Sequence, residues 1–201
     1  MLILASSSAP RKELLARLRL PFQTIVPDAD ETPYPQETPI DLVRRLSELK
    51  ARTIAKQYPD AVIIGGDQVG VCDGEILCKP GTHENAVKQL EKLSNNTAVF
   101  YAGLCLLNSQ ENRIQIDVIA THIIFRVLSH TMIMDYLRDK KPYNCAGTLM
   151  VEQLGIALIK QSRSDDPTAI MGLPLICLTS MLMNEGINVL GTAVRCDVDT
   201  A

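Results

Sequence analysis

The chain of 201 residues is long enough for one domain with a substantial core, or for two closely packed lobes. Hydrophobic residues make up 46% and charged residues 21%, an ordinary balance for a globular protein that argues against disorder. The formal net charge of −3 argues against a global field that attracts nucleic acid, so an anionic ligand needs a local cluster of cations. We treat residues 1–201 as a single domain.

Membrane and secretion signals are not expected in this sequence. No stretch approaches the roughly 18 apolar residues that a membrane-spanning helix needs, and the apolar run at residues 1–5 is too short for a signal peptide. The cysteines form no Cys-x-x-Cys pair and the histidines lie away from any cysteine pair, which argues against structural zinc. This scatter indicates reduced thiols and a cytoplasmic location for the six cysteines Cys72, Cys78, Cys105, Cys145, Cys177 and Cys196.

The first expected element is a short apolar strand over residues 2–5, followed by three serines and the start of a helix. Ser8 is a good N-cap for this helix. Pro10 is tolerated in the first turn, because the amide hydrogen that it lacks would have no partner there. The buried stripe of the helix consists of Leu14, Leu15 and Leu18.

This strand-to-helix junction also predicts an anion site. Backbone amides, serine hydroxyls and the positive end of the helix dipole all face the same space. Arg11 and Lys12 in the first turn oppose that dipole, and a bound anion would relieve the conflict. The segment therefore predicts a phosphate pocket, with a surface helix start bearing two solvated cations as an equally weighted alternative.

The rest of the chain alternates between strand-like and helix-like patterns. The expected elements are a strand at 22–26 ending at Pro27, an acidic, proline-rich loop at 28–38, a helix at 39–57, a buried strand at 61–71 with a hairpin to Ile76, a helix capped by Thr82, two paired strands at 98–108 and 113–127, a helix at 130–140, a short strand at 157–159, and a helix at 174–184 ended by Gly186. This order predicts an α/β fold with a mixed sheet.

The sharpest chemical signal lies in the predicted strand at 61–71, where Gly65 and Gly66 precede Asp67 and Gln68. Glycines allow a ligand or another backbone to approach closely. A buried carboxylate costs several kcal/mol unless it is paired, hydrogen-bonded or bound to a metal. We interpret Asp67 as a metal ligand or as the base that orients water. The alternative is that Asp67 and Gln68 begin a turn at the end of the strand.

Three further charged residues are candidates for the same site. Glu31 in the acidic loop could join Asp67 in holding Mg²⁺, which prefers hard oxygen ligands; taken alone, the loop is more typical of a solvated turn. Lys79 is fixed in direction by Pro80, and Lys50 lies on the predicted helix at its middle. A solvated surface lysine is the alternative for both.

Four separated motifs occur in order along the chain: a strand followed by Ser-x-Ser-x-x-Arg, an Asp-Glu-Thr-Pro loop, a Gly-Gly-Asp-Gln-Val strand, and a Lys-Pro pair after a hairpin. In these motifs the sequence resembles the Maf family of nucleoside triphosphate pyrophosphatases, over about residues 1–190. The form Asp67-Gln68-Val69, with Tyr143-Asn144-Cys145-Ala146-Gly147 and Gly172-Leu173-Pro174-Leu175, resembles the branch that acts on 7-methyl-GTP. Relatives that act on dTTP and UTP typically carry Asp-Thr-Val instead.

The resemblance implies two lobes around a central mixed β-sheet, with the nucleotide in the cleft between them. It implies hydrolysis of a nucleoside triphosphate to the monophosphate and pyrophosphate, with Mg²⁺ or Mn²⁺ as the divalent cofactor. Asp67 corresponds to the proton acceptor and, together with Glu31, to the metal-linked acidic positions. The positions that correspond to triphosphate contacts are Ser6, Ser8, Arg11, Lys12, Glu31, Lys50 and Lys79, and those that correspond to base specificity are Pro10, Gln68 and Glu152.

The chemistry that this resemblance implies is coherent. Water attacks the α-phosphorus, Asp67 orients or deprotonates it, and the divalent cation with the basic side chains neutralises charge on the leaving pyrophosphate. Guanine methylated at its five-membered ring is cationic, so an acidic Glu152 and the Gln68 amide could favour it over an uncharged base.

The chain departs from its relatives mainly at the base end. Pro10 stands where close relatives carry a large aromatic residue, and Met150 and Gln153 stand where relatives often have lysine and glycine; Lys12 replaces an arginine and Cys78 a glycine. The alternatives are a dTTP/UTP pyrophosphatase and a low-turnover nucleotide-binding regulator of cell division. The sequence leaves the oligomeric state open, with a homodimer as one option, and predicts no nucleic-acid or membrane partner.

Overall fold

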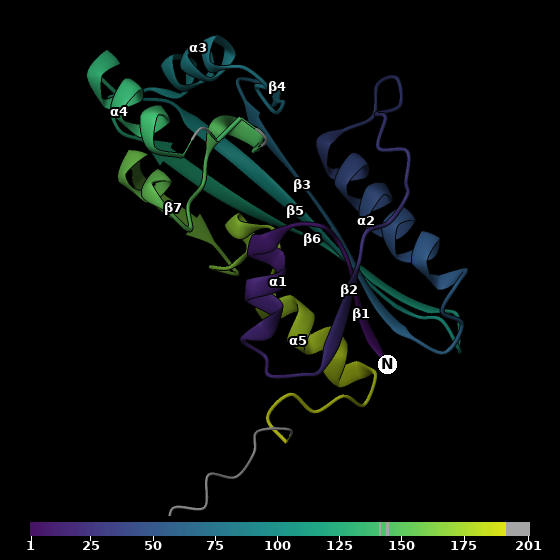
Figure 1. Cartoon of the computed structure of the whole chain (residues 1–201). Coiled ribbons are helices and arrows are strands. Elements are labelled where there is room, and N and C mark those ends of the chain that lie inside the picture. Colours follow the sequence, from purple (N-terminus) through teal and green to yellow (C-terminus); the bar gives the residue numbers. More distant parts are fainter. Residues whose placement is uncertain (141, 144, 192–201) are drawn as a thin grey trace, which may run out of the picture.

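The computed structural model describes residues 1–140, 142–143 and 145–191; Asn144 and Cys196, both named above, lie outside the described residues (Figure 1). The strands are β1 (Leu2–Ala5), β2 (Phe22–Ile25), β3 (Val62–Cys72), β4 (Glu75–Leu77), β5 (Thr97–Asn108), β6 (Arg113–Phe125) and β7 (Ile159–Ser164). The helices are α1 (Ala9–Ala16), α2 (Pro39–Ala55), α3 (His83–Leu93), α4 (His130–Lys140) and α5 (Leu175–Asn184), with short 3-10 helices η1 (Ala146–Thr148), η2 (Leu154–Leu158) and η3 (Ala169–Met171).

The described strands join one mixed sheet of seven, in the order β2-β1-β3-β5-β6-β7, with β4 paired to the end of β3. β1 runs parallel to both β2 and β3, whereas β3, β5, β6 and β7 are antiparallel to their neighbours. The predicted α/β fold with a mixed sheet is therefore confirmed, and β5 and β6 form the predicted hairpin.

The edge of β3 contains a gap that matters for the site. On one side, β5 pairs with every residue from Val62 to Cys72. On the other side, β1 pairs with residues 62–65 and β4 with residues 70–72. Within the described chain no strand pairs with residues 66–69 on that side. Asp67 and Gln68 thus stand at an open window in the sheet rather than in the predicted alternative, a turn at a strand end.

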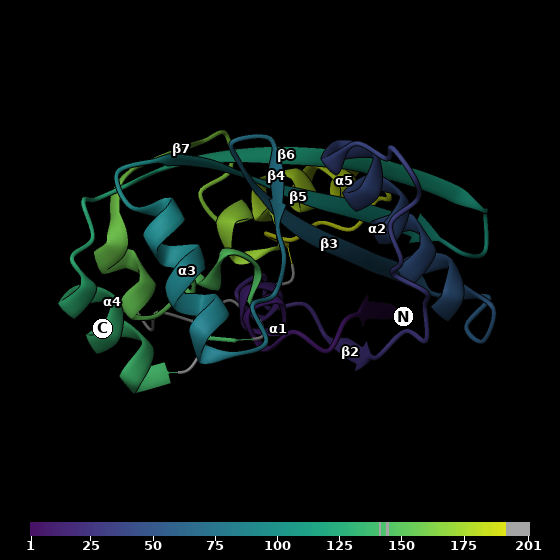
Figure 2. The ribbon, with the colours of Figure 1, turned by 90° about the horizontal axis from the view of Figure 1, so that it is seen from above.

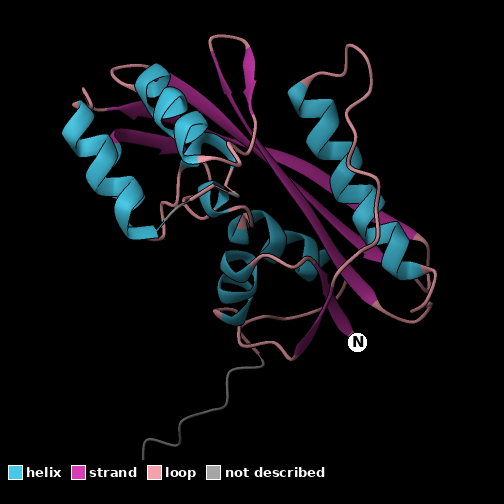
Figure 3. Cartoon of the chain, turned by 45° about the horizontal axis from the view of Figure 1, so that its top comes forward, coloured by secondary structure: helices cyan, strands magenta, loops and turns pink. Residues whose placement is uncertain are grey.

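Helices cover both faces of the sheet (Figures 1 and 2). On one face α2 packs against β3 and β5, with Ala51 and Ile54 in its cluster of buried residues. On the opposite face α1 and α5 pack near β1, in a cluster that contains Leu14 and Leu182. At the far end of the long strands, α3 and α4 bury a separate cluster around Phe125. Figure 3 shows the long strands running between the group of α1, α2 and α5 and the group of α3 and α4, which agrees with the expected two lobes.

The helix starts follow the sequence signals. The Ser8 hydroxyl accepts a hydrogen bond from the Arg11 amide, and Thr38 and Thr82 cap α2 and α3 in the same way. Leu14 and Leu15 are buried, whereas Leu18, the third leucine of the predicted stripe, follows the end of α1 and is only partly buried against the same cluster.

One predicted element is wrong. Residues 157–159 were predicted as a short strand, but η2 occupies 154–158 and β7 begins at Ile159. Gly155 permits this compact turn, because a Cβ there would lie 2.5 Å from the carbonyl oxygen of Met150. Positions 160–163 of β7 are all exposed, so the strand has no alternating pattern by which its sequence could reveal it.

Among the described residues, none of the helices combines the length and the apolar character that crossing a bilayer requires.

Candidate active site

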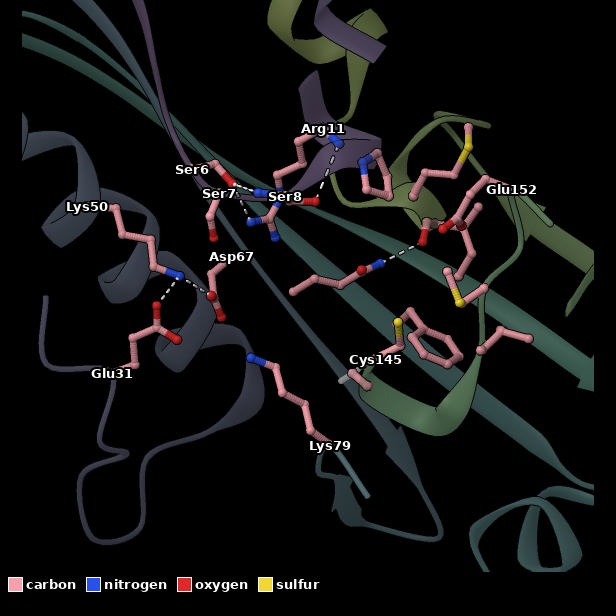
Figure 4. A pocket seen from close by; sticks show the side chains of 18 of the residues that line it. Ser6, Ser7, Ser8, Arg11, Glu31, Lys50, Asp67, Lys79, Cys145 and Glu152 are labelled. Carbon is pink, nitrogen blue, oxygen red and sulfur yellow. Dashed lines mark hydrogen bonds and ion pairs between the residues drawn. The ribbon is translucent and has the colours of Figure 1, made fainter. Parts of the chain in front are cut away.

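A cavity of about 460 Å³ opens at the window in β3, a size typical of small-ligand sites. Its walls come from the β1–α1 junction, the loop after β2, α2, β3, the end of β4, β5, and the segments around η1 and η3 (Figure 4). Of the residues predicted for the site, those that line the cavity are Ser6, Ser8, Pro10, Arg11, Glu31, Lys50, Asp67, Gln68, Lys79 and Glu152. Their roles toward a ligand stay predictions.

Lys12 is the exception among the predicted site residues. Its side chain is exposed and does not line the cavity. Successive residues of a helix point about 100° apart, and the rotation of α1 turns Arg11 towards the cavity and Lys12 towards solvent. The expected pair of cations is therefore a single arginine at the cavity and a solvated lysine beside it.

The β1–α1 junction forms a tight cradle. The buried hydroxyl of Ser6 accepts hydrogen bonds from the Ser8 amide at 3.1 Å and from Nη1 of Arg11 at 3.4 Å. Nε of Arg11 donates to the carbonyl oxygen of Gly172 at 2.8 Å, which fixes the guanidinium over the cavity. Burial lowers the pKa of Arg11, and the nearby charges of Asp67 and Glu31 oppose that shift. The side chain thus stays cationic and points inward.

Two carboxylates meet one ammonium group on the α2 side of the cavity (Figure 4). Nζ of Lys50 lies 2.6 Å from Oδ1 of Asp67 and 2.8 Å from Oε1 of Glu31. The Lys50 side chain is 8% exposed, which contradicts the alternative of a solvated helical lysine. Burial raises the pKa of Glu31, but the hydrogen bond from Lys50 and the charges of Lys50, Lys79 and Arg11 outweigh it, so the pKa lies below its usual value.

Glu31 reaches this point from residues 26–38, which we call the acidic strap. Arg45 on α2 holds the strap: its guanidinium contacts both carboxylate oxygens of Glu37 at 2.5 and 2.7 Å and donates to the carbonyl oxygen of Thr32 at 3.1 Å. It also lies 3.9 Å above the ring of Tyr34. The loop is exposed as predicted, and its anchors place Glu31 at the mouth of the cavity, where its side chain is 52% exposed.

Adjacent residues of β3 point to opposite faces of the sheet, and this alternation divides the site. Asp67 faces α2 and meets Lys50. Gln68 faces the other side, where its Nε2 donates to the carbonyl oxygens of Ile170 at 2.9 Å and Ala169 at 3.3 Å. Because both residues lie at the window, where that side of β3 has no strand partner in the described chain, one cavity reaches both sides of the strand.

The part of the cavity around Gln68 is mainly apolar and rich in sulfur. Its lining includes Met150, which the sequence placed at the base end, and residues that sequence reasoning did not assign to the site: Phe100, Cys145, Leu149, Ile170 and Met171. Phe100 lies inside an apolar strand and has the sequence pattern of a core residue, so the sequence does not mark it as part of a site. Burial raises the pKa of the Cys145 thiol; the Glu152 charge adds to this and Lys79 opposes it. A raised pKa leaves less of the thiolate, the reactive form, at neutral pH.

The η3 turn that contacts Gln68 and Arg11 is held by a buried carboxylate. Asp166 is 1% exposed and accepts hydrogen bonds from the amides of Ile176 and Cys177 at the start of α5, and from Thr168. The Thr168 hydroxyl in turn donates to the carbonyl oxygen of Leu173. Sequence reasoning missed Asp166, because a capping residue normally stands directly before its helix, whereas Asp166 reaches the start of α5 only through the fold of the η3 turn.

Two carboxylates at one point also fit a divalent cation. Glu31 and Asp67 offer hard oxygen donors, and Mg²⁺ is usually bound by one or two carboxylates together with substrate phosphates and water. The described residues hold no cluster of three or more His, Cys, Asp or Glu side chains that would bind a metal without such additional ligands. The donor set therefore suits a cation shared with a phosphate ligand.

The fold and the sequence define the class of the protein in turn. The fold matches that of the Ham1 protein of Staphylococcus aureus with a TM-score of 0.54 and 15% identity, over 92% of this chain and 98% of that chain. At that identity the match concerns the fold alone. The profile of the Maf-like protein family matches residues 1–185, so this chain belongs to the Maf family, as its motifs predicted.

Individual relatives share about half of their residues with this chain. A protein of Nitrosococcus oceani is 50% identical over 189 residues, which cover 94% of this chain and 95% of the relative. A protein of Cupriavidus metallidurans is 49% identical, over 92% of this chain and 93% of the relative. One of Pseudomonas syringae is 48% identical, over 94% and 98%. All three carry the name 7-methyl-GTP pyrophosphatase.

Proposed function

We propose that this protein hydrolyses 7-methyl-GTP to 7-methyl-GMP and pyrophosphate. The observation that carries the proposal is the meeting of Asp67 and Glu31 with three cations, Arg11, Lys50 and Lys79, in one cavity of nucleotide size. Membership of the Maf family and the names of relatives about 50% identical support the same reaction. Mixed charge of this kind suits phosphate transfer, in which positioning and electrostatics supply most of the catalysis.

In the proposed reaction, the triphosphate lies across the β1–α1 junction. The Ser8 hydroxyl and the Arg11 guanidinium bind phosphate oxygens at the helix start, while Lys79 approaches from the end of β4. Water attacks the α-phosphorus and the bond from that phosphorus to the bridging oxygen breaks. We assign the proton from water to the carboxylate of Asp67, which lines the cavity. The bridging oxygen leaves with pyrophosphate, and its charge is balanced by the basic side chains.

Glu31 and Asp67 would hold Mg²⁺ or Mn²⁺, which when bound supplies charge neutralisation at the phosphate oxygens. Every other part of the scheme is assigned to side chains of this chain. Ser6 keeps the guanidinium of Arg11 in place through its 3.4 Å contact, and the acidic strap carries Glu31 to the cavity.

The base would lie on the Gln68 side of β3. Two backbone carbonyls accept hydrogen bonds from Nε2 of Gln68, which leaves Oε1 to accept a hydrogen bond from the base. Glu152 lines the same side and supplies negative charge for the cationic ring of 7-methylguanine. Pro10 stands beside them without an aromatic face, so base selection would rest on hydrogen bonding and charge.

A panel of nucleotides at equal concentration, with Mg²⁺ and with Mn²⁺, tests the proposal by direct measurement of released pyrophosphate. We expect 7-methyl-GTP to give the highest kcat/KM. A preference for dTTP or UTP would favour the first alternative. Binding without turnover of any nucleotide would favour the regulatory alternative, which the convergence of Asp67, Glu31 and Lys50 disfavours.

We also propose a cytoplasmic location, in keeping with the free thiols of Cys72, Cys78, Cys105, Cys145 and Cys177. A homodimer is our working proposal for the assembly. Measurement of the molar mass by static light scattering at several protein concentrations tests it.

A further inference from the structure

Lys50 occupies an unusual place for a lysine expected to bind phosphate. Its ammonium lies between the two carboxylates, 2.6 Å from Asp67 and 2.8 Å from Glu31, and its side chain is 8% exposed. An ammonium with two oxygen partners at these distances fills the space in which a divalent cation would bind the same carboxylates.

The backbone of α2 fixes this position. Lys50 follows Val43 and Ser47 on the buried face of the helix, and this face lies very close to the sheet. A Cβ at Gly65 would come within 2.1 Å of the Ser47 carbonyl oxygen, and one at Gly103 within 2.4 Å of the Val43 carbonyl oxygen. The short gap brings the Lys50 side chain directly to the window in β3.

The other cations of the cavity do not compete for this place. Arg11 is directed to Gly172 and Ser6, and Arg11 and Lys79 influence Glu31 only through their charge at longer range. Among the described residues, Lys50 forms every ion pair of Asp67 and Glu31. The cavity lining holds three cationic and three acidic side chains, so it is balanced as it stands. A divalent cation entering alone would unbalance it.

We propose that Lys50 is a resident cation, which keeps divalent metal out of the free protein and yields its place only when a nucleotide binds. This rests on the proposed function, because the incoming phosphates give the Lys50 ammonium a new partner while the carboxylates are released. Metal and nucleotide then bind in a coupled manner, each increasing the affinity for the other by the same factor.

Titration of the full-length protein with Mn²⁺, followed by the electron paramagnetic resonance signal of free Mn²⁺, tests this without any turnover. In the absence of nucleotide, we expect Lys50→Met to bind Mn²⁺ at least about tenfold more tightly than the unmodified protein, because both carboxylates lose the ion-pair partner that they share in the described part of the chain. Lys79→Met removes the same charge from the same cavity without opening that space, so its Mn²⁺ affinity should change by less than about threefold. Adding Asp67→Asn to Lys50→Met should abolish the gain.

A second measurement stands even if Lys50→Met does not fold. The nucleotide analogue α,β-methylene-GTP has a bridge that cannot be hydrolysed. It should lower the Kd of the unmodified protein for Mn²⁺ at least about tenfold, after correction for the Mn²⁺ that the free analogue binds by itself. Tight Mn²⁺ binding without nucleotide, or equal gains in Lys50→Met and Lys79→Met, would overturn the proposal. The nucleotide panel decides the proposed function separately: turnover without metal–nucleotide coupling rejects this inference alone, whereas coupling without turnover rejects the proposed hydrolysis alone.

Discussion

The two ends of the cavity are built in different ways. At the phosphate end, Arg11, Lys50 and Asp67 belong to regular helices and a strand, and hydrogen bonds of 2.6–2.8 Å fix them. At the base end, Cys145, Met150 and other lining residues come from the segments around η1, η2 and η3. Gln68 of β3 and Phe100 of β5 reach that end from the sheet.

This difference separates reaction chemistry from the choice of base. Side chains on packed helices and strands cannot move without disturbing the core, whereas short connecting segments can change in sequence with little effect on the sheet. Of the departures that the family resemblance implies, Met150 lines the base end from a connecting segment, whereas Pro10 lines it from helix α1.

The largest effect expected at the phosphate end is that of Asp67→Asn. Asparagine keeps the shape of the side chain but cannot accept the proton, so turnover of 7-methyl-GTP should fall by about a thousandfold. Without divalent metal, the affinity for α,β-methylene-GTP, measured by calorimetry, should change by less than about fivefold. Asp73→Asn, in the β3–β4 turn outside the cavity, is the matched control. Near-normal turnover by Asp67→Asn would exclude the proposed base.

Arg11→Lys should lower kcat/KM by about 10–100-fold, and by the same factor for every nucleotide in the panel. A lysine carries the charge but cannot hold Gly172 and a phosphate oxygen together, as the planar guanidinium can. Lys12→Ala should stay within about twofold, because Lys12 lies outside the cavity. A loss that depends on the base would mean that the two ends are not separate.

Glu152→Gln should have the reverse pattern to Arg11→Lys, because it should change the preference between nucleotides and not the rate for all of them. Its charge is exposed and close to the base, so we expect the preference for 7-methyl-GTP over GTP to fall about three- to tenfold, with little change for GTP itself. Glu84→Gln, an exposed change on α3 away from the lining, serves as the control. Equal losses for both nucleotides would place Glu152 with the phosphate end.

The smallest effect concerns the acidic strap and pH. The hydrogen bond from Arg45 lowers the pKa of Glu37 from 4.5 to about 2. A lowered pKa in the folded state means that this contribution to stability is present above about pH 4.5 and is lost as the pH falls towards about 2. Arg45→Ala should therefore lower Tm by about 2–4 °C at pH 7 and by less at pH 3.

Arg44 is exposed and adjacent to Arg45, so Arg44→Ala should neither lower Tm nor make Tm depend differently on pH. Limited proteolysis adds a local measurement, because Arg45→Ala should expose residues 28–38 to cleavage while the segments at the base end keep their resistance. A loss of Tm in Arg45→Ala that is the same at both pH values would contradict the assignment to Glu37.

Local signals predicted the elements well, and tertiary contacts decided the rest. Ser8 as a cap and the apolar run that ends at Val71 depend on neighbouring residues, so the sequence contains them. The burial of Lys50 depends on how close α2 lies to the sheet, and a charged residue on an amphipathic helix gives no hint of that. The β7 boundary follows from pairing with β6, which local patterns do not encode.

The same division holds within the site. Asp67 is conspicuous because a carboxylate interrupts an apolar strand, whereas Phe100 lines the cavity yet looks like any core residue. Whether Arg11 or Lys12 faces the ligand depends on the rotation of a helix about its axis. That rotation is set by the packing of Leu14 and Leu15, one turn further along the same helix.

Because α2 packs so closely against the sheet, its position fixes two parts of the site at once. Lys50 and Arg45 both extend from it, one to the carboxylates and the other to the acidic strap that supplies Glu31. Any movement of α2 away from Gly65 and Gly103 would withdraw the ammonium and the strap together. Two missing methyl groups in the sheet thus govern the spacing of side chains that never touch them.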